Sequence, residues 1–444
     1  MNGIGAGGLA LAAAGGSALA ASPQTADPAK QPALPDAYFI TNVRLETDFE
    51  YEGKEVVGTK TELRTLRIEN GKIAEILPPG GKPSGNISVY DAGGMLMLPT
   101  FRDVHIHLDK TYYGGPWKAV RPNPNGVFDR IKEEQVLLPK LLPTAEERTG
   151  KLVDLMHSKG TTFARSHCNI DPVVGLKNLE HLLHALDERK DGLTYEIVAF
   201  PQHGLLYSDC EGLMREAMKM GVQYVGGLDP TVVDNAMEKS IDTMFQIAVD
   251  SKAGIDIHLH EGGETGIKAI RRIMDMTEQT KLQDKVTVSH AFSLASLSPA
   301  EGKEMFTRMA QLGMTIATSV PIGKGVMPLP LLRECGVNVV CGTDSVIDHW
   351  SPFGTCDILG KANLTAQLYR GLDEYGLNRA LGYATGWVTP LDEKGNQVWP
   401  KAGDEASVNF LPASCSAEAV ARVPERQAVL HKGKLVAGNL ASAV

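Results

Sequence analysis

The sequence lacks several patterns that would point to common functions. It has no C-x-x-C pair, and its six cysteines are scattered, which argues against a zinc ribbon or a redox pair. No G-x-G-x-x-G or P-loop follows a predicted strand, so nothing supports nucleotide binding. No block of like charge forms an interaction tail, and a net charge of −9 argues against nucleic acid as a partner. No segment is apolar enough to be read with confidence as a membrane span.

The composition fits an ordinary soluble globular protein. Hydrophobic residues make up 43% of the 444 residues and charged residues 22%. A chain of this length usually folds as one large domain with a small one, or as two to three domains. We therefore expect a large core and a small molecule as the partner. A homo-oligomer remains an open alternative, because no interface can be identified from the sequence.

The first 36 residues look like a signal segment and a linker. Residues 4–21 are rich in Gly and Ala and end in Ala18-Leu19-Ala20, a small-x-small cleavage pattern, and residues 22–35 are polar and proline-rich. Only Met1, Asn2 and Gly3 precede the apolar stretch, so a basic leading region is missing. This stretch is only mildly hydrophobic and rich in Gly, and in this it resembles signal peptides of the twin-arginine export type. We hypothesise that the true start of the protein lies upstream. We expect a periplasmic or exported protein; the alternative is an Ala/Gly tail on a cytoplasmic one.

The middle of the chain alternates short apolar runs with helical patterns, which predicts an α/β fold. The alternation favours a (β/α)8 TIM barrel, with its active site at the carboxyl ends of the strands. A doubly wound open sheet is the structural alternative. The predicted strands are 101–107, 161–167, 195–200, 222–228, 255–260, 286–290, 314–318 and 337–343. The predicted helices are 144–159, 175–189, 211–220, 235–251, 265–281, 299–312 and 329–335.

The two ends of the chain predict a second, smaller domain. Residues 39–45 and 66–73 alternate in hydrophobicity, with the hairpin signal Asn70-Gly71 in the second segment. Residues 406–411 and 428–436 are again strand-like. We expect a small β-sandwich domain from 37–98 plus 402–444, around a metal-dependent hydrolase barrel at 99–401.

The chemistry-bearing side chains fall at the carboxyl ends of the predicted strands. His105 and His107 are two residues apart and would share one face of a strand. Such a set, gathered at the active end of a barrel, predicts a metal-assisted hydrolase. The others are Gln202 after the third strand, His258, His260 and Glu261 after the fifth, His290 after the sixth and Asp344 after the eighth.

These residue types suit hydrolysis by a metal-activated water. Neutral imidazoles with one carboxylate bind zinc or ferrous iron and leave a position open for water. The metal would lower the pKa of that water from about 16 towards 7. Asp344 could take the proton, Glu261 could pass it to the leaving nitrogen, and His290 could orient the water.

The ordered motifs resemble the cytosine deaminase branch of the amidohydrolase superfamily over about residues 38–438. The resemblance rests on His105-Ile106-His107, Ala199-Phe200-Pro201-Gln202, His258-x-x-Glu261, Ser289-His290 and Asp344-x-x-x-Asp348-x-Trp350. It implies the barrel and a β-sandwich built from both termini.

The resemblance also implies a ligand set and residue roles. One zinc or iron ion would be held by His105, His107, His258 and Asp344. Glu261 would be the proton shuttle, and His290 with Asp344 would activate water. Gln202 would contact the ring amide, and Trp350 would help to enclose the substrate. The fourth strand ends in Gly226-Gly227-Leu228-Asp229, without the lysine of binuclear relatives, which favours one metal ion.

At three positions the sequence departs from the pattern that is usual in cytosine deaminases, and these departures bear on the substrate. Ser345 stands where an Asp near the pyrimidine is usual, His203 replaces an acidic residue after the Gln, and His260 replaces an acid before Glu261. The motif that continues from the first histidine pair, His107-Leu108-Asp109-Lys110, resembles the corresponding motif of N-substituted ammelide hydrolases. We therefore predict a deaminase of a cyclic amidine, either a cytosine-like pyrimidine or an aminotriazine. The alternatives are an amidohydrolase of a cyclic imide or N-acyl amide, and a metal-bearing protein without activity.

Overall fold

The central unit is a barrel of parallel strands. The structure, a computed structural model, describes residues 33–323 and 325–443. An eight-stranded sheet has the order β13-β12-β11-β10-β9-β8-β7-β6, and its neighbours pair in parallel. The strands are β6 Phe101–Ile106, β7 Thr161–Asn169, β8 Thr194–Phe200, β9 Tyr224–Leu228, β10 Gly254–Leu259, β11 Val286–His290, β12 Thr315–Thr318 and β13 Asn338–Cys341.

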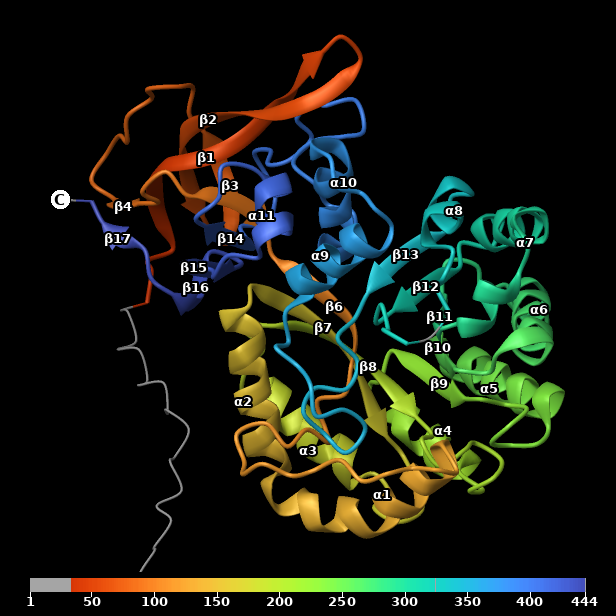
Figure 1. Cartoon of the computed structure of the whole chain (residues 1–444). Coiled ribbons are helices and arrows are strands. Elements are labelled where there is room, and N and C mark those ends of the chain that lie inside the picture. The colour runs from red at the N-terminus through yellow and green to blue at the C-terminus, as the bar shows by residue number, and fades with distance from the viewer. Residues whose placement is uncertain (1–32, 324, 444) are drawn as a thin grey trace, which may run out of the picture. The chain divides into compact units, whose positions relative to one another are not determined.

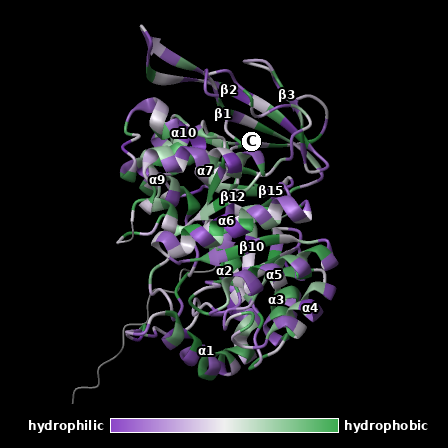
Figure 2. Cartoon of the chain, turned by 90° about the vertical axis from the view of Figure 1, so that its right-hand side faces the viewer, coloured by the Kyte–Doolittle hydropathy of each residue, from purple (hydrophilic) through white to green (hydrophobic). Residues whose placement is uncertain are grey.

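Helices between these strands surround the barrel (Figure 1). They are α2 Ala145–Ser158, α3 Lys177–Asp187, α4 Glu211–Lys219, α5 Met237–Ser251, α6 Gly263–Thr280, α7 Pro299–Gln311 and α8 Leu329–Glu334, with short 3-10 turns at Leu142–Thr144 and Phe292–Ser296. Purple and green alternate along several of these helices in Figure 2, as expected for helices with one face on the core. A capping box between Ser298 and Glu301 begins α7.

The barrel closes where β13 meets β6. The Asp344 backbone N–H donates to the His105 carbonyl oxygen at 2.7 Å, and Ile106 pairs with Asp344 in parallel. Gly342 makes this approach possible, because a Cβ there would lie 2.5 Å from the carbonyl oxygen of His105. The predicted (β/α)8 barrel is thus confirmed.

Both ends of the chain build the second sheet. Its nine strands follow the order β16-β15-β14-β5-β1-β2-β3, with β4 between β1 and β17. Most pairs are antiparallel, and β14 joins the two ends of the chain by pairing with β5. The strands are β1 Ala37–Glu52, β2 Glu55–Glu69, β3 Lys72–Ile76, β4 Ser88–Asp91, β5 Leu96–Pro99, β14 Val408–Leu411, β15 Ala428–His431, β16 Lys434–Gly438 and β17 Ala441–Ser442.

Four helices lie outside the sequence prediction: α1 Val127–Leu141, α9 Ile358–Leu368, α10 Glu374–Thr385 and α11 Ser416–Arg422. Helix α1 buries the charged Arg130 and Glu134 on its inner face, so its sequence lacks a clean apolar stripe. Helices α9 to α11 pack with Leu96, Phe101 and Leu411 into one apolar cluster between sheet and barrel. Their mixture of small and apolar residues hides the helical period.

The fold does not test the predicted signal segment or the predicted export. The signal-like segment and linker lie almost entirely outside the described residues, and export stays a prediction. Within residues 33–323 and 325–443, no helix combines the length and apolar character needed to cross a membrane.

All six cysteines are free thiols, and five are buried.

A buried carboxyl in β1 predicts pH-dependent stability. Glu46 is 1% exposed; its Oε1 accepts the Ser416 N–H at 2.5 Å, whereas Oε2 has no hydrogen-bond partner among the described residues. Burial raises the pKa of Glu46 to about 7. The folded protein therefore binds the proton more tightly than the unfolded chain, so stability falls as pH rises from about 4.5 to 7.

We expect Glu46→Gln to raise the free energy of unfolding at pH 8 by roughly 1–3 kcal/mol, and to have little effect at pH 5. Urea unfolding of both proteins at the two pH values measures this difference. The exposed Glu52→Gln serves as the charge-matched control. An equal effect of Glu46→Gln at both pH values would contradict the assignment.

Candidate functional site

The first two histidines lie at the carboxyl end of β6, His105 within the strand and His107 directly after it. His105 and His107 are 2% and 3% exposed. The His105 Nδ1 lies 2.8 Å from the Ser289 hydroxyl, which donates to Asp256 at 2.7 Å. Because that hydroxyl hydrogen is used, His105 donates from Nδ1, and in the neutral ring the lone pair then lies on Nε2. His107 Nδ1 donates to the His167 carbonyl oxygen at 3.2 Å, which leaves its Nε2 in the same state.

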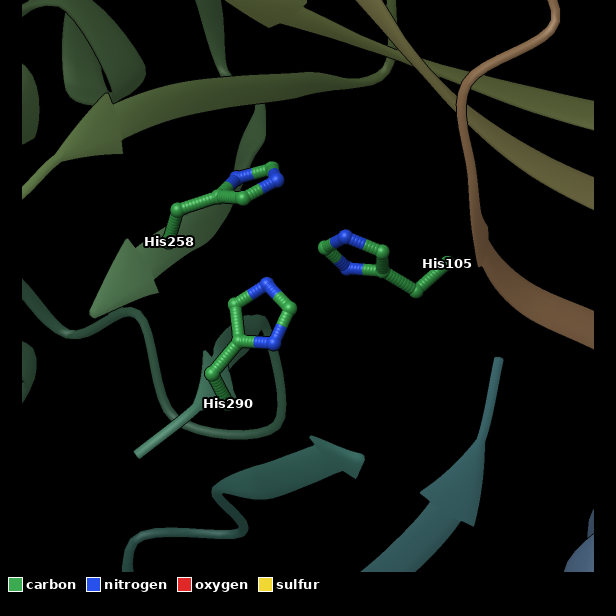
Figure 3. Close-up of side chains that lie close together, drawn as sticks. All are labelled: His105, His258 and His290. Carbon is green, nitrogen blue, oxygen red and sulfur yellow. The ribbon is translucent and has the colours of Figure 1, made fainter. Parts of the chain in front are cut away.

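Three further side chains complete a cluster in which the imidazoles are buried and Asp344 is partly exposed. His258 is the last residue but one of β10, His290 ends β11 and Asp344 follows β13. The Asp344 Oδ1 lies 3.6 Å from Nε2 of His105 and 3.5 Å from Nε2 of His107. The Nε2 atoms of His258 and His107 are 3.3 Å apart. Figure 3 shows the rings of His105, His258 and His290 converging from separate strands.

This cluster fits a divalent metal ion. Among the described residues, the buried Nε2 atoms of His105 and His290 have no hydrogen-bond partner. Burial, followed by the nearby Lys110, lowers the pKa of His107 to about 4, so this imidazole is neutral. Burial likewise holds the pKa values of His258 and His290 well below the usual range. Neutral imidazoles beside one carboxylate are the donors that zinc and ferrous iron prefer.

A cavity of about 180 Å³ opens over the cluster. Engineered cavities of about 150 Å³ hold a benzene ring, so the space suits one small heterocycle. Of the predicted site residues, six line it: His107, Gln202, His258, Asp344, Ser345 and Trp350. The remaining lining residues are Lys110, His260 and Ser351.

Four predicted residues do not line this cavity: His105 and His290, which belong to the cluster, and Glu261 and His203. The Glu261 carboxylate accepts the backbone N–H groups of Thr231 and Val232 at 2.6 and 2.8 Å, and the Thr231 hydroxyl at 2.9 Å. His203 is 1% exposed and lies behind the wall, with Nε2 3.3 Å from a Glu134 oxygen. His260 instead stands in the wall, and its Nδ1 lies 2.9 Å from Asp229.

Glu134 is a site residue that no pattern in the sequence predicted. This carboxylate is fully buried and accepts from the side chains of Lys110, His349 and Trp350. It lies on α1, in a segment without a predicted helix, next to the similar Glu133. No sequence signal separates these two acids, because only the fold shows which one faces inward.

The comparisons with known proteins agree with this fold. A model of the amidohydrolase family matches residues 88–437, and the chain belongs to that family. The uncharacterized protein YahJ of Escherichia coli (strain K12) is 55% identical over 406 residues, which cover 91% of this chain and 88% of that protein.

Two solved structures share the fold. N-isopropylammelide isopropylaminohydrolase from Burkholderia multivorans has a TM-score of 0.80 at 32% identity, and the match covers 92% of this chain and all of that one (100%). The 5-methylcytosine deaminase of Klebsiella pneumoniae has a TM-score of 0.74 at 23% identity, covering 91% and 99%, which is a likeness of fold. The resemblance inferred from the sequence motifs is thus confirmed, and the chain is a hydrolase of carbon–nitrogen bonds.

The hydrogen bonds of Ser289 predict a role in holding metal. Ser289→Ala would remove the acceptor of the His105 Nδ1–H, so the ring would lose its fixed tautomer and orientation. We expect zinc affinity to fall by about 10–100-fold with the fold intact. Competition with a chelator measures the affinity, and the exposed Ser158→Ala is the control. Unchanged affinity would remove Ser289 from this role.

Proposed function

We propose that this protein is a metal-dependent deaminase of a cyclic amidine, either a cytosine-like pyrimidine or an aminotriazine. The observation that carries the proposal is the cluster of buried histidines and Asp344 beside a cavity for one ring. The name of the ammelide relative, 32% identical over nearly the whole chain, supports ammonia or an amine as the group released.

In this proposal His105, His107, His258 and Asp344 hold one divalent ion, zinc or iron. Bound there, the ion would act as a Lewis acid and lower the pKa of water. Support for a single ion comes from the end of β9. The residue there is Asp229, which forms a hydrogen bond with His260, and no lysine stands there to bridge a second ion. The metal's identity and number remain part of the proposal.

The surrounding residues divide the remaining work. Asp344 would accept the proton of the attacking water at a carboxylate oxygen, and His290 would orient that water. Trp350 and Gln202 line the cavity and would hold the ring. Ser345 lines the same cavity and would contact a ring substituent, whereas His203 would act on the substrate only through Glu134.

Two residues compete for the transfer of the proton to the leaving nitrogen. Glu261 is the residue that the sequence motif indicates, but Thr231 and Val232 hold its carboxylate. His260 lines the cavity, is oriented by Asp229 and stacks on His290 with ring centroids 4.3 Å apart. The geometry favours His260.

Paired variants separate the two candidates. We expect His260→Gln to lower kcat by about 10²-fold or more, and Glu261→Gln by less than about 10-fold, with metal retained in both. Steady-state kinetics with metal analysis measures this. The reverse order would return the role to Glu261, which would then have to leave Thr231 to reach the substrate.

Ammonia release tests the function itself. We expect the metal-loaded enzyme to release ammonia or an alkylamine from at least one of cytosine, 5-methylcytosine, isocytosine, ammelide or N-alkyl ammelides, with the ring intact. Chelation should abolish the activity, and added zinc or iron should restore it. No release from any of these, with metal bound, would favour the second candidate, hydrolysis of a cyclic imide or N-acyl amide by the same cluster.

A further inference from the structure

A buried carboxylate on α1 contacts the loop that carries Trp350. Glu134 is 0% exposed, and its Oε1 atom accepts from Trp350 Nε1 at 3.0 Å and from His349 Nε2 at 2.7 Å. Its Oε2 atom accepts from the Asn169 amide at 2.8 Å. One side chain thus connects α1 with the loop after β13 and with the end of β7.

Lys110 keeps this carboxylate ionised. Its ammonium donates to Glu134 Oε1 at 3.2 Å, and both side chains are buried. Burial alone would raise the pKa of Glu134, but Lys110 and the histidine donors hold it well below the usual range. A hydrogen bond to an ionised acceptor is roughly twice as strong as one between neutral groups. The indole N–H of Trp350 is therefore held by a charged oxygen.

The backbone of the Trp350 loop is fixed by other contacts. Asp348 Oδ1 accepts the N–H groups of Trp350 and Ser351 at 2.7 and 3.0 Å. The Tyr112 N–H donates to the Ile347 carbonyl oxygen at 2.6 Å, which joins this loop to the loop after β6. With its backbone held in this way, the indole of Trp350 could still turn about its two side-chain torsions.

The hydrogen bond to Glu134 removes this remaining freedom. Nε1 lies on the ring away from Cβ, so a bond at this atom fixes both side-chain torsions of Trp350. A turn about either torsion would separate the N–H from its ionised acceptor, which is costly where water cannot replace it. Because Trp350 lines the cavity, the orientation of its ring sets the shape of that wall.

We propose that Glu134 is a positioning residue that holds the Trp350 indole at the cavity before substrate arrives. The wall is then preformed, and substrate binding needs no reordering of this side chain. Avoiding that cost corresponds to about 3–10-fold in affinity. The inference rests on the proposed function in taking this cavity as the substrate site, but the position of Trp350 can be measured without a substrate.

Hydrogen exchange at the indole N–H tests the position of Trp350 in the ligand-free protein. The chain has four tryptophans, so labelling them with 15N gives four indole signals, and Trp350→Phe assigns the signal of Trp350. We expect its exchange to be at least about 10²-fold slower than that of Trp117, which is 75% exposed. Equal exchange rates at the two indoles would overturn the inference.

The variant Glu134→Gln tests the role of the carboxylate. It removes the charge and leaves one acceptor oxygen for four donors, those of Lys110, Asn169, His349 and Trp350. We expect indole exchange at least about 10-fold faster. With the substrate that ammonia release identifies, we expect KM to rise by about 3–10-fold and kcat to stay within about 2-fold, because the wall contacts the ring equally before and in the transition state.

Glu133→Gln is the matched control. Glu133 is the preceding residue of α1, and its carboxylate pairs with Arg130 at 2.6 Å. This variant makes the same change of charge and should keep the wild-type KM and the wild-type exchange rate at Trp350. A merely structural defect of α1 would lower the folded fraction, and with it the apparent kcat, without a change in KM.

A second variant covers the case in which Glu134→Gln does not fold. Lys110→Met combined with Glu134→Gln removes both buried charges together, so neither is left unpaired. We expect the same acceleration of at least about 10-fold in exchange at the Trp350 indole. Exchange is the measurement for this variant, because Lys110 itself lines the cavity and its loss would alter KM directly.

The outcomes distinguish this inference from the proposed function. Unchanged indole exchange in Glu134→Gln, or a KM equal to that of Glu133→Gln, would overturn the inference and leave deamination standing. If no substrate is turned over, the proposed function fails, and slow exchange at Trp350 that depends on Glu134 would still support the positioning role.

Discussion

The site depends on one backbone hydrogen bond that closes the barrel, from the Asp344 N–H to the His105 carbonyl oxygen. It joins the last strand to the first and sets a carboxylate beside two imidazoles. The contact requires Gly342, since any side chain there would collide with the His105 backbone. Closure of the barrel and assembly of the cluster are therefore the same event, and a barrel left open at this seam would have histidines without their carboxylate.

Below the cluster, a polar layer inside the barrel holds His105 in place. Asp256 accepts from Ser289 on one oxygen and from Arg165 on the other, and Arg165 also pairs with Glu196 at 2.8 Å. Removal of these charges from water is costly unless each finds its partners. Because the partners come from four different strands, the layer is satisfied only when the barrel has its native register. The same interactions thus select the register and fix the tautomer of His105.

The sequence predicted the barrel well because its signals are local. Each of the eight predicted strands overlaps an observed one, and the site residues fall at strand ends as expected. What could not be predicted comes from long-range packing. Helix α1 buries Glu134 against Lys110 and Trp350, and a charged residue on an inward face looks like an exposed one in the sequence. Likewise the motif places Glu261 near the metal ligands, but only the three-dimensional structure shows its oxygens engaged by Thr231 and Val232.

Stability alone does not account for the Glu134–Lys110 pair. A buried ion pair usually contributes no more than an apolar pair of the same volume, and often less, because both charges lose their hydration. Here the carboxylate also engages Asn169, His349 and Trp350, so that together with Lys110 its partners come from three separate segments and offset the cost of its burial. An apolar pair could not fix the orientation of a neighbouring polar group. An ammonium aimed at Gln202 sets the polarity of an amide at the cavity wall, and an aliphatic side chain in the same place would leave that amide free to present either end.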